Sequence, residues 1–409
     1  MQRRVVITGL GIYSCIGQTI DTVLDALRNG RSGIDVIPER KAYGYHSVLS
    51  GIVPKPDLRN LLDRRQRVSM SQQAEFAYVA TKDALLQAGI NNDYIQQHSV
   101  GVIFGNDSSA DAIIKSARVI DQKHDTELIG SGSLFQSINS TVTMNLSTAL
   151  HLTGINFTIS AACASGNHSI GVASMFIKSG MQDVIVCGGA QEINLNSSIS
   201  FDALGVFSKY NGNPTQASRP FDKNRDGLIP SGGAAAIILE DLDHARQRGA
   251  KILAEVIGYG FSSNGVKITQ PSVSGEKASM TMALQNAGLT PADISYINAH
   301  ATSTPDGDIT EAQAITDIFG EKTVPVSSTK SMTGHECWMS GVSETVYSVL
   351  MLNNNFIAPN INFTEGDSYT QKLNIVTKTT DIELTNILSN SFGFGGTNAT
   401  IIITKYNNN

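Results

Sequence analysis

Short apolar runs alternate along the whole chain with longer stretches that carry apolar residues at helical spacing. The short runs are rich in β-branched residues and predict strands, and the longer stretches predict helices. The predicted strands cover residues 5–8, 100–104, 156–160, 184–187, 234–239, 253–259, 294–299, 325–328, 386–389 and 399–404. The predicted helices cover residues 19–29, 71–89, 110–118, 140–151, 164–179, 276–288, 308–318 and 341–353. This alternation is typical of an α/β fold with a largely parallel, buried sheet.

The chain repeats one part of this pattern in its two halves. The segment NFTISAACASGNHSIGVASMFIKSG runs from a strand through a small-residue turn into a helix, and VPVSSTKSMTGHECWMSGVSETVYSVL repeats that order. Gly-rich turns follow both segments, CGGA in the first half and SFGFGGTN in the second. Because no Pro- or Ser-rich linker intervenes, we expect two similar halves, residues 1–250 and 251–409, that share one core. The functional site is expected between them.

Composition narrows the classes of function. The chain has 409 residues, of which 41% are hydrophobic and 16% charged, so it can bury a large core. A formal charge of −6 disfavours a general nucleic-acid-binding role. Neither a signal peptide nor a run long enough to span a membrane is present in the sequence, which favours a cytoplasmic protein.

The four cysteines are too few and too scattered for a disulfide scaffold, and none forms a CxxC pair. Cys163 lies in SAACASGNHSIG, directly after a predicted strand and before a predicted helix. A helix N-terminus favours a thiolate, and its free N–H groups can bind an oxyanion, so Cys163 is the candidate nucleophile. The alternative is a small buried hydrophobic residue, which is the interpretation we keep for Cys15 and Cys187.

Two histidines also follow strands into small-residue turns, His300 in INAHATSTPDGD and His335 in STKSMTGHECWMSG. Two imidazoles at strand ends can converge on a cysteine and exchange protons or donate hydrogen bonds to a developing negative charge. Lys330 and Glu344 flank His335 and favour this catalytic hypothesis over two structural histidines. A metal site is not expected, since neither HxH nor HExxH spacing occurs.

The segment SFGFGGTN, residues 391–398, is a Gly-rich turn with two phenylalanines. Its glycines allow backbone N–H groups to face a ligand, and its phenylalanines could wall an apolar pocket. It matches neither GxGxxG nor the P-loop spacing, so a phosphate site is weakly indicated. A simple tight turn between two strands is the alternative.

These segments together resemble the thiolase-like condensing enzymes, specifically the β-ketoacyl-acyl-carrier-protein synthases of the elongating type. The resemblance runs over nearly the whole chain and is strongest to synthase I of bacterial type II fatty acid synthesis. It rests on VVITGLG, SAACASGNHSIG, FDALGVFSKY, RPFDKNRDGLI, INAHATSTPDGD, STKSMTGH, FIAPNINF, LNIVTKTTDIELT and SFGFGGTNATIII. It implies a five-layered αβαβα fold and a homodimer.

The resemblance also implies roles for single residues. Cys163 matches the nucleophile that holds the acyl group as a thioester, and His300 and His335 match the pair that promotes decarboxylation of malonyl carrier protein. Further matches are Lys330, which supports the second histidine, the structural acid Glu344, the gating Phe392 whose backbone N–H joins that of Cys163 in an oxyanion hole, and the pantetheine-binding Thr302 and Thr304.

The implied reaction is a decarboxylative condensation of the acyl group with malonyl-acyl-carrier-protein, which elongates a fatty acid chain. It needs no metal or redox cofactor, because loss of carbon dioxide generates the carbanion directly. The implied partner is an acidic acyl carrier protein, for which Arg64, Arg65 and Arg67 form a candidate docking patch. A solvated helix face is the alternative. A second basic group of the family is reduced here to Lys115, Arg118, Lys123 and His124.

The clearest departure from the family pattern follows His335, where GHECWMSG replaces small residues resembling GHSLGAAG. Glu336, Cys337, Trp338 and Met339 either pack inside the helix without effect or reshape the acyl pocket or a partner surface. The second possibility leaves open a specialised polyketide or aryl-polyene synthase that works with a chain-length-factor partner, as a heterodimer. A non-catalytic partner subunit and a thiolase are disfavoured, because the first generally lacks the cysteine and the second uses a Cys/His/Cys set.

Overall fold

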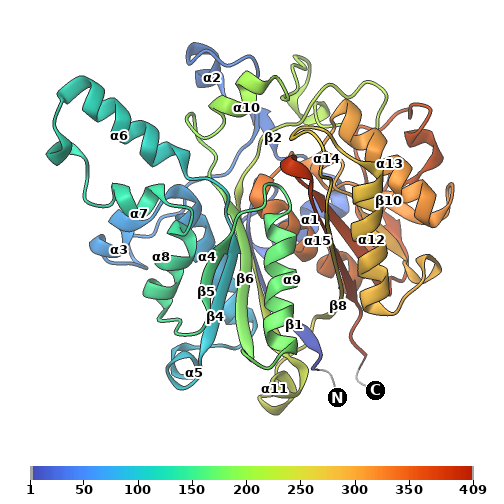
Figure 1. Ribbon diagram of the computed structural model, residues 1–409, viewed down its shortest axis with the longest axis horizontal. Helices are drawn as coiled ribbons and strands as arrows, with labels where there is room; N and C mark the ends of the chain where they lie inside the picture. The colour runs from blue at the N-terminus through green and yellow to red at the C-terminus, as the bar shows by residue number, and fades with distance from the viewer. Residues whose placement is uncertain (1–2, 408–409) are drawn as a thin grey trace.

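The computed structural model describes residues 3–407, and in this part of the chain one mixed sheet holds eleven strands (Figure 1). Their order is β12-β10-β9-β14-β15-β8-β1-β7-β6-β4-β5. The strands are β1 (Val5–Tyr13), β4 (Val100–Gly105), β5 (Asn156–Ile159), β6 (Val184–Gln191), β7 (Gly233–Asp241), β8 (Ala254–Ser263), β9 (Tyr296–Asn298), β10 (Pro325–Ser327), β12 (Asn374–Ile375), β14 (Asn386–Phe392) and β15 (Thr397–Thr404). Each of the ten predicted strands is present.

Each of the eight predicted helices is also present. They are α1 (Ile20–Asn29), α4 (Gln72–Gln87), α6 (Ala110–Lys123), α8 (Thr141–Leu150), α9 (Ser165–Lys178), α12 (Val273–Ala287), α13 (Pro305–Phe319) and α15 (Ser340–Asn354). The pattern missed shorter elements, because a single turn has too few residues to show a period. These are α2 (Pro38–Ala42), α3 (Arg64–Ser69), α5 (Asn92–Gln97), α7 (Ser133–Ser137), α10 (Ile199–Leu204), α11 (Leu242–Gln247), α14 (Lys330–Thr333), β2 (Ile34–Val36), β3 (Leu49–Gly51), β11 (Phe356–Ile357), β12 (Asn374–Ile375) and β13 (Thr380–Asp381).

The two ends of the sheet repeat one topology. The order β1-β7-β6-β4-β5 in the first half corresponds, strand by strand along the chain, to β8-β15-β14-β9-β10 in the second. The halves join where Val5–Ile7 of β1 pair antiparallel with Ala254–Val256 of β8. In this correspondence β5–α9 and β10–α15 are equivalent strand-to-helix junctions. The predicted domain boundary at residue 250 falls between α11 and β8 and stays a prediction.

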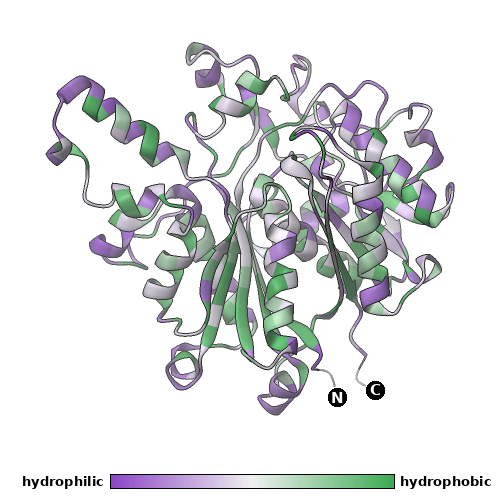
Figure 2. Cartoon of the chain, in the orientation of Figure 1, coloured by the Kyte–Doolittle hydropathy of each residue, from purple (hydrophilic) through white to green (hydrophobic). Residues whose placement is uncertain are grey.

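The layers follow from which faces the helices cover. Helices α9 and α15 pack against each other and lie between the two halves of the sheet, since α9 contacts β6 and β15 and α15 contacts β7 and β14. Helices α4 and α8 cover the outer face of the first half, and α12 covers that of the second, with α13 against it (Figure 1). The result is the expected αβαβα arrangement. The strands and inward helix faces are mainly apolar, whereas α5 and α11 at the rim are mainly polar (Figure 2).

The expectation of a largely parallel sheet is wrong. Strands β4, β5 and β6 pair in parallel, as do β9, β10, β12 and β14, but β1, β7, β8 and β15 make antiparallel pairs. Strands β14 and β15 are joined by a short turn, which brings the chain back beside itself in the opposite direction. The apolar content of a strand indicates burial on both faces but not the direction of the strand. The sequence pattern therefore could not distinguish parallel from antiparallel pairing. No helix within residues 3–407 is long and apolar enough to cross a membrane.

Candidate active site

The junction between β5 and α9 presents Cys163 at the start of a helix. Ala162 just before it has φ of 47°, an unusual left-handed conformation for a residue other than glycine. The Ser165 hydroxyl stabilises this turn, because it accepts from the Ala161 N–H at 2.8 Å and donates to the Ala162 carbonyl at 2.6 Å. The Cys163 side chain is thereby fixed in a buried position, with 6% of the residue exposed.

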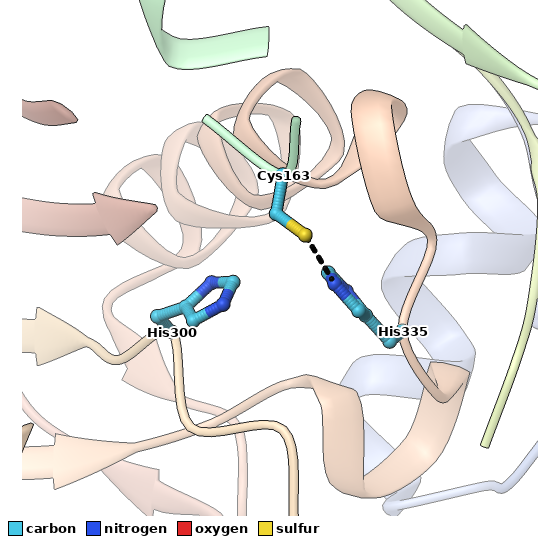
Figure 3. Close-up of side chains that lie close together, drawn as sticks. All are labelled: Cys163, His300 and His335. Carbon is cyan, nitrogen blue, oxygen red and sulfur yellow. Dashed lines mark hydrogen bonds between the residues drawn. The ribbon is translucent and has the colours of Figure 1, made fainter. Parts of the chain in front are cut away.

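The two predicted histidines converge on this thiol from the other half of the molecule (Figure 3). His300 follows β9, and His335 follows α14 through Gly334. The Nε2 atom of His335 lies 3.0 Å from the Cys163 sulfur. The rings of His300 and His335 are nearly perpendicular, with centroids 5.3 Å apart. The structure therefore brings together the three residues that the sequence predicted to act together.

The three side chains open into a cavity of about 370 Å³. Its apolar wall includes Phe201, Leu228, Phe392 and Phe394. Thr302 and Thr304 line it as well, and their hydroxyl oxygens are 3.1 Å apart. The cavity therefore offers one apolar wall and one hydroxyl-bearing wall on the approach to the thiol, which is consistent with the pantetheine role predicted for the two threonines.

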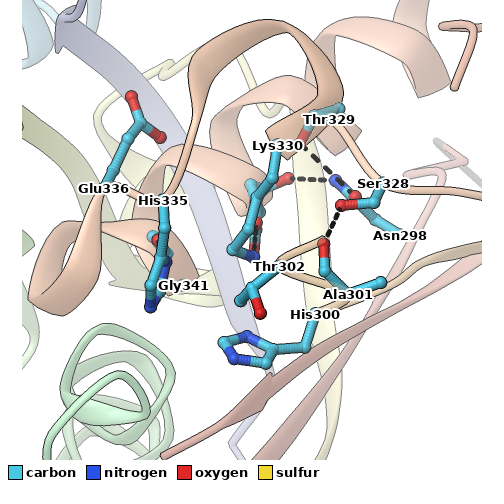
Figure 4. A network of polar contacts seen from close by, with 12 residues as sticks. Asn298, His300, Ala301, Thr302, Ser328, Thr329, Lys330, His335, Glu336 and Gly341 are labelled. Carbon is cyan, nitrogen blue, oxygen red and sulfur yellow. Dashed lines mark hydrogen bonds and ion pairs between the residues drawn. The ribbon is translucent and has the colours of Figure 1, made fainter. Parts of the chain in front are cut away.

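A buried ion pair lies behind the histidines. Lys330 Nζ bonds the Glu344 carboxylate, and both side chains are 1% exposed. Figure 4 shows the Lys330 side chain extending toward His300 and His335. Burial raises the pKa of Glu344 to about 7, although the ammonium group opposes that rise. Burial and the Lys330 charge together hold the pKa values of His300 and His335 well below the usual range. Both imidazoles are therefore neutral at physiological pH, as the predicted chemistry requires.

The resting state of Cys163 differs from the sequence expectation of a thiolate. Burial raises its pKa to about 12, and the Asp107 carboxylate adds to the rise, while Lys330 opposes it. Desolvation thus outweighs the helix N-terminus, because a buried thiolate loses its water. The thiol is the resting form, and His335 Nε2 is placed to take its proton.

Two backbone N–H groups face the Cys163 sulfur. The backbone N–H groups of Cys163 and Phe394 are the ones that stabilise negative charge on the Cys163 sulfur. Phe392 instead ends strand β14, and its ring lies 5.9 Å from that of His300. The donor role predicted for Phe392 stays a prediction, and Phe394 is a second candidate for it in the same turn. The motif holds two phenylalanines on either side of one glycine, and sequence alone could not say which backbone faces the thiol.

Two buried acids that the sequence did not single out fix the His300 loop. Glu311 accepts from the N–H of His300 at 2.9 Å and from that of Ala301 at 2.7 Å. Asp308 accepts from the Thr302 N–H at 3.0 Å. Burial raises the pKa of each acid to about 7. Their spacing three residues apart on α13 puts both carboxylates on one helix face, and this periodicity was the available signal.

Asp107 and Ser340 were also missed. Asp107 lies two residues beyond β4, as His300 lies two residues beyond the equivalent β9, and the Ser160 hydroxyl donates to its carboxylate. Ser340 begins α15, and its hydroxyl lies 3.2 Å from Nδ1 of His335. The internal repeat could have indicated Asp107, whereas a serine five residues after a histidine gives no specific signal.

The residues of the divergent GHECWMSG segment are all buried, between 0% and 6% exposed, and this excludes an exposed partner surface. Glu336 accepts from the hydroxyls of Ser343 and Tyr347. The Trp338 ring packs 6.1 Å from that of Phe201, which lines the cavity. Cys337 and Met339 are buried as well. Trp338 is not itself a lining residue of the cavity, but it packs behind Phe201, which is one.

The predicted docking patch lies on helix α3. Arg64 and Arg65 are exposed and Arg67 is partly buried. In the second basic group, Lys115 pairs with Asp111 at 2.6 Å and Arg118 lies over the ring of Tyr43. Within residues 3–407 none of the three arginines of α3 forms an ion pair, so α3 presents three basic groups close together on one short helix.

The Cys163 sulfur and the ring nitrogens of His300 and His335 lie within 4.8 Å of one another, and such a set can also ligate a soft metal ion. The positive charge of Lys330, which acts on all three groups, opposes a cation there. The expectation of a site without metal stays a prediction.

Comparisons with known proteins agree with this geometry. The model for the beta-ketoacyl synthase N-terminal domain matches residues 2–245, and that for the C-terminal domain matches residues 253–364. The 3-oxoacyl-[acyl-carrier-protein] synthase 1 of Escherichia coli (strain K12) is 42% identical over 406 residues, which cover 98% of this chain and 99% of that protein.

Two solved structures are similar over the full length. A beta-ketoacyl synthase from Burkholderia phymatum STM815 superposes with a TM-score of 0.94 at 34% identity and covers 100% of both chains. A ketosynthase solved in complex with its type II polyketide synthase acyl-carrier protein superposes with a TM-score of 0.91 at 27% identity, covering 99% of this chain and 100% of that one.

Proposed function

The chain belongs to the beta-ketoacyl synthase family, and from that premise we propose that Cys163, His300 and His335 perform its condensation reaction. The protein is an acyl-transferring condensing enzyme of fatty acid elongation. It joins an acyl group to malonyl-acyl-carrier-protein and gives 3-oxoacyl-acyl-carrier-protein. The identity to fatty acid synthases exceeds that to a polyketide ketosynthase, 42% against 27%, which favours this function over a specialised polyene synthase.

The observation that carries the proposal is the 3.0 Å contact between His335 Nε2 and the Cys163 sulfur in a cavity that His300 also lines. In the first half-reaction the Cys163 sulfur attacks the acyl thioester carbonyl as its proton passes to His335. The N–H groups of Cys163 and Phe394 stabilise the resulting oxyanion. The proton then passes from His335 to the departing pantetheine sulfur.

In the second half-reaction the malonyl group loses carbon dioxide, and its thioester oxygen becomes an enolate oxygen. Neutral His300 and His335 each donate a hydrogen bond to that oxygen from a ring N–H. The enolate carbon attacks the acyl-Cys163 carbonyl, and the carbon–sulfur bond to Cys163 breaks. The Cys163 sulfur leaves as a thiolate and takes one proton from solvent to return to the thiol. We expect no metal or redox cofactor, since decarboxylation supplies the electron pair for the new carbon–carbon bond.

The test separates the two half-reactions. The full chain is incubated with an acyl-carrier-protein thioester, and a mass increase of one acyl group on Cys163 is expected by mass spectrometry. Cys163→Ala should abolish acylation and condensation, while carbon dioxide release from malonyl carrier protein persists because the histidine pair remains. Absence of both activities from the folded wild-type chain would overturn the proposal.

We propose further that α3 docks an acidic acyl carrier protein through Arg64, Arg65 and Arg67. A basic patch on a chain of net charge −6 attracts such a partner selectively. Reversal of all three arginines to Glu should raise KM for the carrier-bound substrate at least tenfold, with little effect on a pantetheine thioester. Equal effects on both substrates would contradict the docking role.

A homodimer is the proposed assembly, and β5 is its proposed contact. This strand is the edge of the sheet and pairs only with β4 within residues 3–407, so its other side offers free backbone groups. Asn156 at its start is exposed. Sedimentation at micromolar concentration should give twice the chain mass of 43.6 kDa, whereas a monomer that still condenses would contradict this assembly.

A further inference from the structure

The His335 ring is held at both of its nitrogen atoms. Nε2 faces the Cys163 sulfur at 3.0 Å, and Nδ1 faces the Ser340 hydroxyl at 3.2 Å. His335 is 2% exposed and Ser340 is fully buried. The imidazole therefore lies between a hydroxyl and a thiol, and water has little access to Nδ1.

The Ser340 hydroxyl is free to act either as donor or as acceptor. Within residues 3–407 its oxygen has no hydrogen-bond partner other than His335. Its backbone is fixed, because Ser340 begins α15 and its carbonyl accepts from the Ser343 hydroxyl at 3.0 Å. A hydroxyl on a fixed backbone can rotate its hydrogen toward or away from Nδ1, which a backbone N–H or a carboxylate cannot do.

His300 lacks this arrangement. Its Nδ1 is buried without a hydrogen-bond partner, although the ring packs against His335 and Phe392. Both imidazoles are neutral, so the hydrogen on a ring sits on one nitrogen or the other. At His335 alone a neighbouring side chain can influence which nitrogen carries it.

We propose that Ser340 is a positioning residue that sets the tautomer of His335 in each half-reaction. When the hydroxyl accepts from Nδ1–H, the Nε2 lone pair faces Cys163 and can take the thiol proton. When the hydroxyl donates to Nδ1, Nε2 carries the hydrogen and donates it to the enolate oxygen. This inference rests on the proposed condensation at Cys163.

The proton count closes within the site for acyl transfer, whereas condensation takes one proton from solvent, because the Cys163 sulfur leaves the new 3-oxoacyl group as a thiolate and must return to the thiol. In acyl transfer the S–H bond of Cys163 breaks, the S–C bond forms, and Nε2 holds the proton until the departing pantetheine sulfur takes it. His335 then remains in the Nδ1–H form. Change to the Nε2–H form moves one hydrogen between the ring nitrogens with no net gain or loss, and the Ser340 hydroxyl turns to donate. His300 also lies within 4.8 Å of the thiol, and the other ionisable groups that act on it are Lys330, Asp107 and Cys337.

The test compares Ser340→Ala and Ser340→Thr with Thr345→Val in the full chain. Thr345 is a buried residue of the same helix whose hydroxyl bonds only its own helix, to Gly341 at 2.8 Å, and it serves as the matched control. Ser340→Ala should slow carbon dioxide release from malonyl carrier protein about tenfold, because the donor at Nδ1 is lost. Acylation of Cys163 should slow less, and Ser340→Thr should restore both rates.

The ¹⁵N chemical shifts of the His335 ring give a readout that needs no turnover. Wild type and Ser340→Thr should show a mixture of the two tautomers that Ser340→Ala displaces. If Ser340→Ala matches Thr345→Val in these shifts and in the ratio of the two rates, the proposal is wrong. If the wild type performs neither half-reaction, the proposed function fails, while the shifts still report on Ser340. Ser340→Cys, which keeps the volume with a weaker hydrogen bond, replaces the alanine variant if that variant does not fold.

Discussion

The two strand-to-helix junctions that meet at the site occupy equivalent places in the repeated topology and differ in chemistry. The β5–α9 junction, residues 160–164, holds one reactive side chain and no charged one. The β10–α15 junction, residues 328–339, is longer, contains α14, and holds Lys330, His335 and Glu336. The repeat thus gives both junctions the same direction toward the site, and the longer one supplies the groups that control protons.

This difference shows in the electrostatics. Lys330 of the second junction acts across the site on Cys163 of the first, where it opposes the rise in the thiol pKa. Burial lowers the pKa values of both imidazoles, and the Lys330 charge adds to that effect, so both rings are neutral. The first junction positions the Cys163 thiol, and the second supplies the Lys330 charge that acts on it. Each prediction below removes one element of the second junction and asks whether the first still works.

The largest effect is expected from Lys330→Met. This substitution leaves Glu344 buried and without its partner, so we expect a loss of about 3–5 kcal/mol in the free energy of unfolding, measured with urea. The pKa values of the histidines should rise as the ammonium charge is removed. The pH profile of malonyl decarboxylation should therefore shift to higher pH, since a neutral imidazole is required.

The control for this change is the double variant Lys330→Met with Glu344→Leu. It removes both charges and should recover most of the lost stability, because an apolar pair replaces a buried ion pair at little cost. Its pH profile should stay shifted. Equal stability of the single and double variants would show that the buried carboxylate is not the source of the loss.

An intermediate effect is expected from Trp338→Ala. The side chain is 5% exposed and packs on Phe201, so its loss should destabilise the fold by about 3 kcal/mol. The space left behind lets Phe201 retreat from the cavity, and longer acyl groups should then be accepted on Cys163. Competition among acyl thioesters of different length, read by mass spectrometry, measures this shift. Trp338→Phe is the control, and an unchanged acyl profile would assign Trp338 to packing alone.

The contrast between the junctions also explains what the sequence could predict. Cys163, His300 and His335 each follow a strand in a turn of small residues, and the ends of neighbouring strands meet, so their convergence was predictable. Strand direction was not, because apolar runs look alike in parallel and antiparallel pairs.

Side-chain partners were harder to predict than positions. Phe392 and Phe394 are separated only by Gly393 in a Gly-rich turn. Only the folded backbone shows which of their N–H groups faces Cys163. The short helical turn at Cys337–Met339 brings the Ser340 hydroxyl next to the His335 ring. Hydrophobic periodicity in the sequence does not predict that turn. The protonation of Cys163 depends on burial by residues distant in sequence, which a local motif does not contain.

The smallest effect is expected from Glu336→Gln, which replaces the buried carboxyl group of the second junction with an amide that does not titrate. Burial raises the pKa of Glu336 from 4.5 to about 8, so within this window the native protein keeps a proton that the unfolded chain has lost. Wild-type stability should therefore fall as pH rises, by about 1.4 kcal/mol between pH 6 and pH 7 relative to the variant. Urea unfolding at both pH values measures the difference, in which the contributions of Glu344, Asp308 and Glu311 cancel because both proteins carry them. Ser343→Ala, which removes one donor to Glu336, is the control and should keep the wild-type dependence of stability on pH. If the free energy of unfolding changes equally with pH in wild type and Glu336→Gln, Glu336 does not hold its proton.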